Sequence, residues 1–316
     1  MSTYVEARDV AAAVAAMADG ARPVAGGTDL VVGARHGKAP LPESIVGIHR
    51  IPGLSEIAVT DGVVRIGALT SHAAILASAE LAAATPGLLD ASAIVGSHAT
   101  RANGTLGGNV MNASPAMDTG APLLCHDAVA VLTGPGGTRR VGLADLWTGP
   151  GRTSASADEL MEAVELPVPP AGAGSAYVRL QYRRQMEIAV VGAGAYVELD
   201  DSGVVTVARV AISALTPVIC RVPAAEEALM GRRLGTNGSI SSRSDAVSAQ
   251  TSPMADALQA AGQAAAEAAT PISDVRASAS YRTAMAAVIT RRAIAAALTR
   301  ATGGTVAVPA SDWSQR

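Results

Sequence analysis

Two short runs of polar residues around adjacent glycines are the best candidates for chemistry in this sequence. They are Ala25-Gly26-Gly27-Thr28-Asp29 and Thr105-Leu106-Gly107-Gly108-Asn109, and each follows a segment typical of buried structure. Glycine lets a ligand approach the main-chain N–H groups closely, and successive N–H groups pointing the same way bind anions. Two facing loops of this kind suit a diphosphate. The alternative is that both are ordinary turns, which glycine pairs mark in many proteins.

Two other glycine clusters do not predict a nucleotide site. Thr133-Gly134-Pro135-Gly136-Gly137 lies between two strand-like runs, so we interpret it as the tip of a hairpin. Gly192-Ala193-Gly194 begins like a dinucleotide fingerprint, but Val197 occupies the third glycine position and no helix follows. The first two loops remain the only serious pair.

The composition is typical of a globular protein and does not favour binding to nucleic acid or to anionic lipid. Of the 316 residues, 49% are hydrophobic and none is phenylalanine, so no aromatic surface for stacking bases is expected. The net charge of -3 offers no basic face for nucleic acid or anionic lipid. The sequence shows no signal peptide and no uninterrupted apolar run of membrane-spanning length, so a cytoplasmic location is expected.

The potential metal ligands are scattered. Cys125 and Cys220 lie far apart and cannot by themselves hold an iron–sulfur cluster or a four-cysteine zinc site. The histidines also occur singly, so we predict no metal site on this chain; they are His36, His49, His72, His98 and His126.

The first half of the chain must position the two loops. A helix over 7–19 and strands over 22–25 and 44–51 predict a small lobe at 1–55. A hairpin is expected over 56–66, with Asp61-Gly62 as its turn. Thr70 or Ser71 caps the next helix and Pro86 begins another, which leads to the second loop.

The second half begins after a proline-rich linker at 167–172 and a preceding strand at 160–168. Strands are expected at 176–182, 187–199 and 204–212, arranged as an antiparallel meander. A loop is expected at 231–253, helices at 254–269 and 276–300, and a tail from Gly303.

With these landmarks in order, the chain resembles the FAD-binding medium subunit of the molybdenum hydroxylases, the xanthine dehydrogenase and carbon monoxide dehydrogenase family. Several motifs carry the resemblance besides the Ala25–Asp29 loop: Ile66-Gly67-Ala68, Arg101 to Asn109, Asn112 to Asp118, and Ser273 to Arg282. Together they span most of the chain.

The resemblance implies an α+β fold in two domains. The first, 1–170, is an FAD-binding domain of the vanillyl-alcohol-oxidase (PCMH) type, with lobes at about 1–55 and 56–170. The second, 173–302, is a small α/β domain with a three-stranded antiparallel sheet and helices, followed by a tail at 303–316.

The resemblance also assigns roles to residues. It gives the FAD diphosphate to Ala25, Gly26, Gly27, Thr28 and Asp29 and to Thr105, Gly107, Gly108 and Asn109. It places Asp118 near the ribityl or ribose hydroxyls, although an Asp after Ser-Pro could also be a helix cap. Arg179 stands where the family has a lysine beside the flavin ring, unless it is a solvated strand charge. Met161 matches a leucine that packs on the flavin and is otherwise a core residue.

The function that the resemblance implies is electron transfer within a larger complex. FAD on this chain would pass electrons to an acceptor, while molybdopterin and [2Fe-2S] clusters would sit on a large and a small partner subunit, as a dimer of heterotrimers. No catalytic side chain is required, because the cofactor carries the chemistry. The alternatives are a self-contained FAD-dependent oxidoreductase with its own substrate, and a nucleotide-binding module without redox chemistry.

Overall fold

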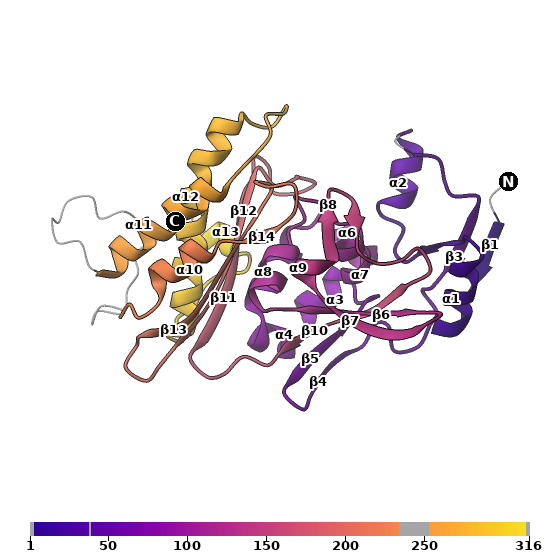
Figure 1. The fold of residues 1–316 in the computed structure, drawn as a ribbon, viewed down its shortest axis with the longest axis horizontal. Helices are drawn as coiled ribbons and strands as arrows, with labels where there is room; N and C mark the ends of the chain where they lie inside the picture. The colour runs from indigo at the N-terminus through magenta and orange to yellow at the C-terminus, as the bar shows by residue number, and fades with distance from the viewer. Residues whose placement is uncertain (1–2, 38, 234–252, 314–316) are drawn as a thin grey trace.

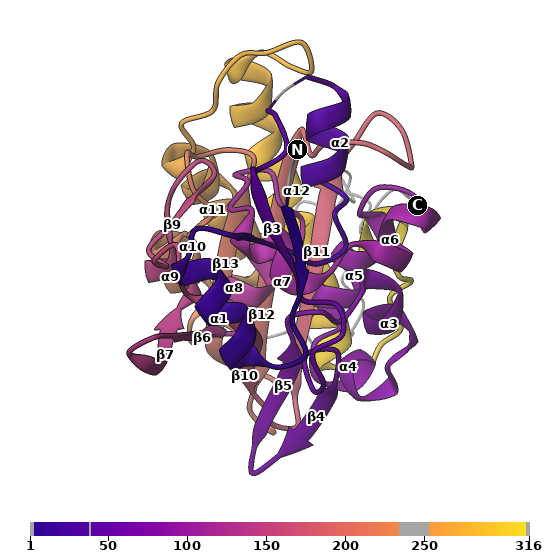
Figure 2. The same cartoon turned by 90° about the vertical axis from the view of Figure 1, so that its right-hand side faces the viewer.

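The structure is a computed structural model that describes residues 3–37, 39–233 and 253–313. The chain runs from an N-terminal lobe through a central sheet with helices to a C-terminal sheet covered by long helices (Figure 1). Helix α2 (Leu30–Arg35) lies near the upper edge of both views, and the hairpin of β4 (Ile57–Thr60) and β5 (Val63–Gly67) lies at the lower edge (Figures 1 and 2). Among the helices that the structure describes, none has the length and apolar character needed to cross a membrane.

The N-terminal lobe is a parallel sheet with strand order β1-β3-β2. Helix α1 buries Ala13, Val14 and Met17, and the Asp9 side chain caps it by accepting from Ala12 N at 2.7 Å. Helix α1 is shorter than the expected 7–19, and β1 and α2 had no counterpart in the sequence prediction. The elements are β1 (Thr3–Glu6), α1 (Val10–Ala18), β2 (Arg22–Val24), α2 (Leu30–Arg35) and β3 (Ser44–Gly47).

The central sheet has the strand order β4-β5-β10-β6-β7. The expected hairpin is present, and its turn residues Asp61 and Gly62 have φ values of 51° and 76°, as a tight two-residue turn requires. The 133–137 glycine cluster joins β6 to β7 as the expected tip. The strands are β4 (Ile57–Thr60), β5 (Val63–Gly67), β6 (Val129–Gly134), β7 (Gly137–Gly142) and β10 (Leu160–Pro167).

Short helices fill the chain between β5 and β6. Ser71 caps the first by accepting from Ala74 N at 3.1 Å, and Pro86 occupies the first turn of α5, as expected. These helices are α3 (His72–Ala77), α4 (Ala79–Ala84), α5 (Pro86–Ile94), α6 (His98–Asn103), α7 (Leu106–Met111) and α8 (Gly120–Cys125). Helix α9 (Leu143–Leu146) and strands β8 (Trp147–Gly149) and β9 (Arg152–Thr153) follow β7.

The C-terminal sheet is antiparallel with the order β11-β12-β13-β14. The three expected strands are joined by a fourth of two residues, so the sheet is larger than predicted. One face packs on α12 and α10, against which α11 lies, and the other face packs on α8 (Figure 1). The elements are β11 (Ala173–Leu180), β12 (Val191–Leu199), β13 (Val205–Ser213), β14 (Cys220–Arg221), α10 (Pro223–Leu229), α11 (Pro253–Ala268) and α12 (Ala279–Ala301). Most of the loop expected at 231–253 lies outside the described residues.

Strand β11 is an edge strand, and side chains from distant segments satisfy its free edge. Buried Asp90 of α5 accepts from Tyr177 N at 3.0 Å and from both terminal nitrogens of Arg300 at 2.6 and 2.9 Å. Ser311 Oγ accepts from Arg179 N at 2.9 Å, and Ala310 N donates to Asp90. The segment expected to be a tail therefore docks, through α13 (Ala310–Trp313), on the strand that carries Arg179.

Candidate functional site

The two glycine loops meet in the structure. A Cβ atom at Gly26 would lie 1.8 Å from the carbonyl oxygen of Asn103, just before the second loop. A Cβ atom at Gly104 would lie 3.5 Å from Thr28 Oγ1 of the first loop. The backbones are thus close enough that glycine is required at 26, and the two loops lie side by side.

The first loop offers unused hydrogen-bond donors. From Gly26 to Asp29, no backbone N–H donates to any residue that the structure describes. Gly27 has φ +66°, the left-handed conformation that brings successive N–H groups to one side. Asp29 begins α2 without a side-chain capping bond. Four adjacent amides therefore remain available to an anion.

The second loop uses its amides internally, which differs from the expectation that both loops present them. Leu106 N and Gly107 N donate to the carbonyls of Thr70 and Ala68 at 2.9 and 2.8 Å. Gly108 N donates to Thr105 Oγ1 at 3.1 Å, because Thr105 is the N-cap of α7. This stretch is a helix start packed on the β5–α3 connection.

The two glycines of the second loop have different roles. A Cβ atom at Gly107 would lie 2.5 Å from Cβ and 2.7 Å from O of Ala68, so this glycine serves packing. Gly108 is exposed, and its Cβ atom would meet only Thr105 Oγ1, at 2.9 Å. Gly108 is therefore the member of the pair that a ligand can approach.

Asn109 connects this loop to a buried charge pair. Its Oδ1 accepts from Thr119 Oγ1 at 2.6 Å, next to Asp118. Asp118 Oδ2 accepts from Arg179 Nη1 at 2.7 Å, and Oδ1 accepts from the Tyr177 hydroxyl at 2.9 Å. Burial raises the pKa of Asp118 to about 6, while the Arg179 guanidinium opposes that rise. Two predicted site residues from distant segments are thus in direct contact.

The alternatives considered for these two residues from the sequence are wrong. Thr119, and not Asp118, is the N-cap of α8. The Arg179 side chain is 0% exposed, so it is not a solvated strand charge. Its Nε and Nη2 both donate to Gln181 Oε1, and Nη1 also donates to the Glu187 carbonyl at 3.3 Å. Each of the three guanidinium nitrogens thus donates to an acceptor within the protein.

Met161 lies in β10 with 4% exposure, inside the central hydrophobic core. The carbonyl of its neighbour Glu162 accepts from Ala68 N at 2.8 Å, and Ala68 is the residue on which Gly107 packs. The strand that carries Met161 therefore supports the second loop from below.

Two histidines are buried without charged partners of opposite sign. Burial lowers the pKa of His72 to about 4, and nearby Arg101 adds to this. Burial lowers the pKa of His126 to about 3, and its Nε2 atom has no hydrogen-bond partner. The His126 ring stacks edge-on with Tyr196 of β12, at 4.8 Å between centroids. Both are neutral packing residues.

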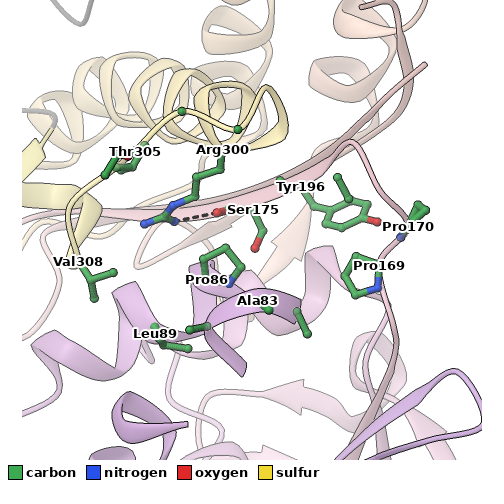
Figure 3. Close-up of a pocket in the computed structure, with 17 residues that line it drawn as sticks. Ala83, Pro86, Leu89, Pro169, Pro170, Ser175, Tyr196, Arg300, Thr305 and Val308 are labelled. Atoms are coloured by element: carbon green, nitrogen blue, oxygen red, sulfur yellow. Dashed lines mark hydrogen bonds between the residues drawn. The ribbon is translucent and has the colours of Figure 1, made fainter. Parts of the chain in front are cut away.

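One groove lies away from these residues. It measures about 420 Å³ and opens between the α4–α5 segment, the start of β11 and the chain after α12 (Figure 3). Arg300 forms one wall, but its guanidinium is engaged by Ser175 O and Asp90. None of the predicted site residues, all of which the structure describes, lines this groove.

Sequence reasoning missed Tyr177 and Gln181, which complete the surroundings of Arg179. Part of the signal was present, because residues 177 and 179 alternate along β11 and so point to one face of the strand, and 181 follows directly after it. Ser311 could not have been found this way, since its contact with Arg179 N spans 132 positions.

Two family models match the chain. The model described as FAD binding domain in molybdopterin dehydrogenase covers residues 1–169, and the one described as CO dehydrogenase flavoprotein C-terminal domain covers 175–260 and 254–297. The fold and these two matches define an FAD-binding subunit of the oxidoreductase class. The chain belongs to the family of FAD-binding medium subunits of the molybdenum hydroxylases.

Individual relatives align over nearly the whole chain. The carbon monoxide dehydrogenase medium chain of Afipia carboxidovorans is 33% identical over 93% of this chain and 94% of its own length. The 6-hydroxypseudooxynicotine dehydrogenase complex subunit alpha of Paenarthrobacter nicotinovorans is 30% identical over 94% and 95%. The solved carbon monoxide dehydrogenase of Hydrogenophaga pseudoflava superposes with a TM-score of 0.84 at 30% identity, covering 95% of this chain and 98% of that one.

The residues present fit an FAD diphosphate at the first loop. A diphosphate needs several hydrogen-bond donors and little steric obstruction. The free amides from Gly26 to Asp29 supply the donors, and the absence of side chains at Gly26 and Gly27 leaves the space. The exposed face of Gly108 leaves space on the opposite wall.

Proposed function

We propose that this chain binds FAD non-covalently between its two glycine loops and passes electrons within a multi-subunit molybdenum hydroxylase. The observation that carries the proposal is the row of unused amides from Gly26 to Asp29, held against the second loop at Asn103. Bound FAD would supply the electron-transfer chemistry, and the chain's residues would bind and orient it.

Each predicted site residue has a proposed task. The amides of Gly26, Gly27, Thr28 and Asp29 would hold the diphosphate, and Ala25 leads into the loop from β2. Thr105 and Gly107 would keep α7 in place, and Gly108 would admit the ligand.

The remaining residues would act further along the cofactor. Asn109 and Asp118 would orient hydroxyl-bearing parts, and Met161 would contribute to the apolar support of the flavin. Arg179, near the flavin, would stabilise negative charge there; because its guanidinium is enclosed, its charge would act in surroundings of low polarity, where electrostatic effects are stronger than in water.

We further infer that the chain has two domains, one at 1–170 of the PCMH type and one at 173–302. Electrons would arrive from a small partner subunit that carries the [2Fe-2S] clusters, and a large partner subunit would hold the molybdopterin. A dimer of heterotrimers in the cytoplasm stays our expectation. The supports are the two family models, which meet between residues 169 and 175, and the relatives named as medium chains.

Reconstitution with FAD tests the first part of the proposal. The purified chain should take up about one FAD per chain, visible as flavin absorbance, and should co-purify with a molybdenum-containing chain and an iron–sulfur chain. A chain that stays colourless after FAD addition would refute the proposal, and one that turns over a substrate alone would favour the self-contained oxidoreductase.

A further inference from the structure

The surroundings of Arg179 single out a residue with no assigned role. Gln181 lies two positions further along the chain, directly after β11, and its Oε1 accepts from both Nε and Nη2 of Arg179. The 2.9 Å bond to Nε and the second bond to Nη2 engage one edge of the planar guanidinium. Hydrogen bonds along one edge fix the orientation of the planar guanidinium group.

The opposite edge of the guanidinium is held by a different element. Nη1 donates to Asp118 Oδ2 at 2.7 Å and to the Glu187 carbonyl at 3.3 Å. Asp118 is itself fixed by the Tyr177 hydroxyl, which also contacts Ser213 Oγ at 3.2 Å. Gln181 and Asp118 thus clamp Arg179 from two sides.

The two clamping residues differ in charge. The Asp118 carboxylate balances the single positive charge of Arg179 and Gln181 is a neutral amide, so this cluster of three side chains avoids a net negative charge because position 181 is not acidic. A carboxylate at 181 would face the same guanidinium and give the cluster a net negative charge.

We propose that Gln181 is a positioning residue, which fixes the plane of the Arg179 guanidinium and keeps the cluster from becoming negative, and so sets how readily the bound flavin accepts electrons. The inference rests on the proposed function, in which Arg179 stabilises the reduced flavin. Gln181 acts through Arg179 and does not need to contact the cofactor itself.

The test measures the flavin reduction potential of the full chain reconstituted with FAD. Gln181→Glu keeps the size and the acceptor oxygen, but it replaces the amide NH2 group with a second oxygen and adds a negative charge. It should retain FAD and lower the equilibrium constant for reduction about tenfold, which for two electrons is a shift of about 30 mV to lower potential.

A matched control exists on the far helices. Gln259 of α11 also accepts a hydrogen bond from an arginine, Arg291 of α12, and it is exposed. Gln259→Glu makes the same charge change beside the same type of partner and should leave the potential unchanged. An equal shift in both variants would overturn the proposal, since it would reflect total charge alone.

Two further variants separate the possible failures. Gln181→Met removes the acceptor without adding charge, and it should also move the potential because the guanidinium loses its fixed plane. If Arg179→Gln shifts the potential while neither Gln181 variant does, the positioning role is overturned and the flavin role of Arg179 stands. If Arg179→Gln itself leaves the potential unchanged with FAD bound, the proposed flavin role of Arg179 fails as well.

Discussion

Asp118 and Arg179 come from segments 61 positions apart, and they form a buried ion pair with 2.7 Å between Oδ2 and Nη1. The pair joins the chain before α8 to the strand β11, and both side chains are at most 9% exposed. Such a pair is costly to break from one side, because the partner is left as an unpaired charge out of water.

Asp118→Asn should therefore lower the free energy of unfolding by about 3–5 kcal/mol. Urea unfolding of the two proteins measures this difference. Asp127→Asn is the matched control, because Asp127 likewise pairs with arginine, in its case with two arginines, but its side chain is 48% exposed. Asparagine also tolerates the positive φ of 50° at this position. The control should lose at most about 1 kcal/mol. Equal losses would contradict a special role for burial at Asp118.

Gly26→Ala should abolish FAD retention and destabilise the chain. The new Cβ atom would lie 1.8 Å from Asn103 O, so the two loops would have to separate. Flavin absorbance per chain and the melting temperature report the two effects. Gly33→Ala, in α2 a few residues further on, meets nothing within 4 Å and should keep FAD. It should even stabilise α2 slightly, by up to about 1 kcal/mol. If both variants bind FAD equally well, close contact between the two loops is not needed for FAD binding.

The neighbouring glycines of the second loop should respond differently to alanine. Gly107→Ala presses on Ala68 and should cost about 1–3 kcal/mol of stability. Gly108→Ala meets only the Thr105 hydroxyl, whose lost capping bond is worth about 1 kcal/mol, so this variant should fold but hold FAD less tightly. Thermal unfolding and an FAD titration distinguish the two. If the folded Gly108→Ala variant binds FAD as tightly as the wild type, FAD does not lie against Gly108.

His126 should make stability depend on pH between about 7 and 5. Its pKa is lowered from 6.5 to about 3 by burial, so below pH 6.5 the unfolded chain gains a proton that the folded chain does not. The stability is fully present above pH 6.5 and falls with pH, by about 2 kcal/mol at pH 5.

His126→Gln removes this contribution, so its unfolding free energy should fall by about 2 kcal/mol less than wild type between pH 7 and 5. Urea unfolding at the two pH values gives the comparison. The same substitution at exposed His98 should leave the pH dependence of the wild type in place. A parallel fall in the His126 variant and the wild type would show that this ring is protonated in the fold.

Local sequence signals predicted much of the fold. Asp61-Gly62 determined the hairpin turn and Pro86 the start of α5, because both features depend only on adjacent residues. The pairing of the two loops was also foreseen from their shared pattern. The unequal use of their amides was not, since it depends on Ala68 and Thr70, which lie in another segment.

The enclosure of Arg179 was beyond the reach of sequence patterns. A single arginine in a strand predicts an exposed charge, but here the guanidinium pairs with Asp118 and the backbone N–H donates to Ser311, from two distant segments. The docking of 310–311 was likewise unforeseen, because the glycines at 303 and 304 are typical of a tail. Both features come from contacts between segments that are far apart in the chain.

The edge of β11 has a consequence for any attempt to isolate or transplant the first 170 residues. Asp90 depends on Arg300, which lies 210 positions later, and Asp118 depends on Arg179. A fragment that stops at the linker would keep two interior carboxyl groups and lose both of their cations. During synthesis the ribosome makes Arg300 and Ala310 long after the glycine loops, so the cofactor-binding half waits for the rest of the chain before its interior charges are neutralised.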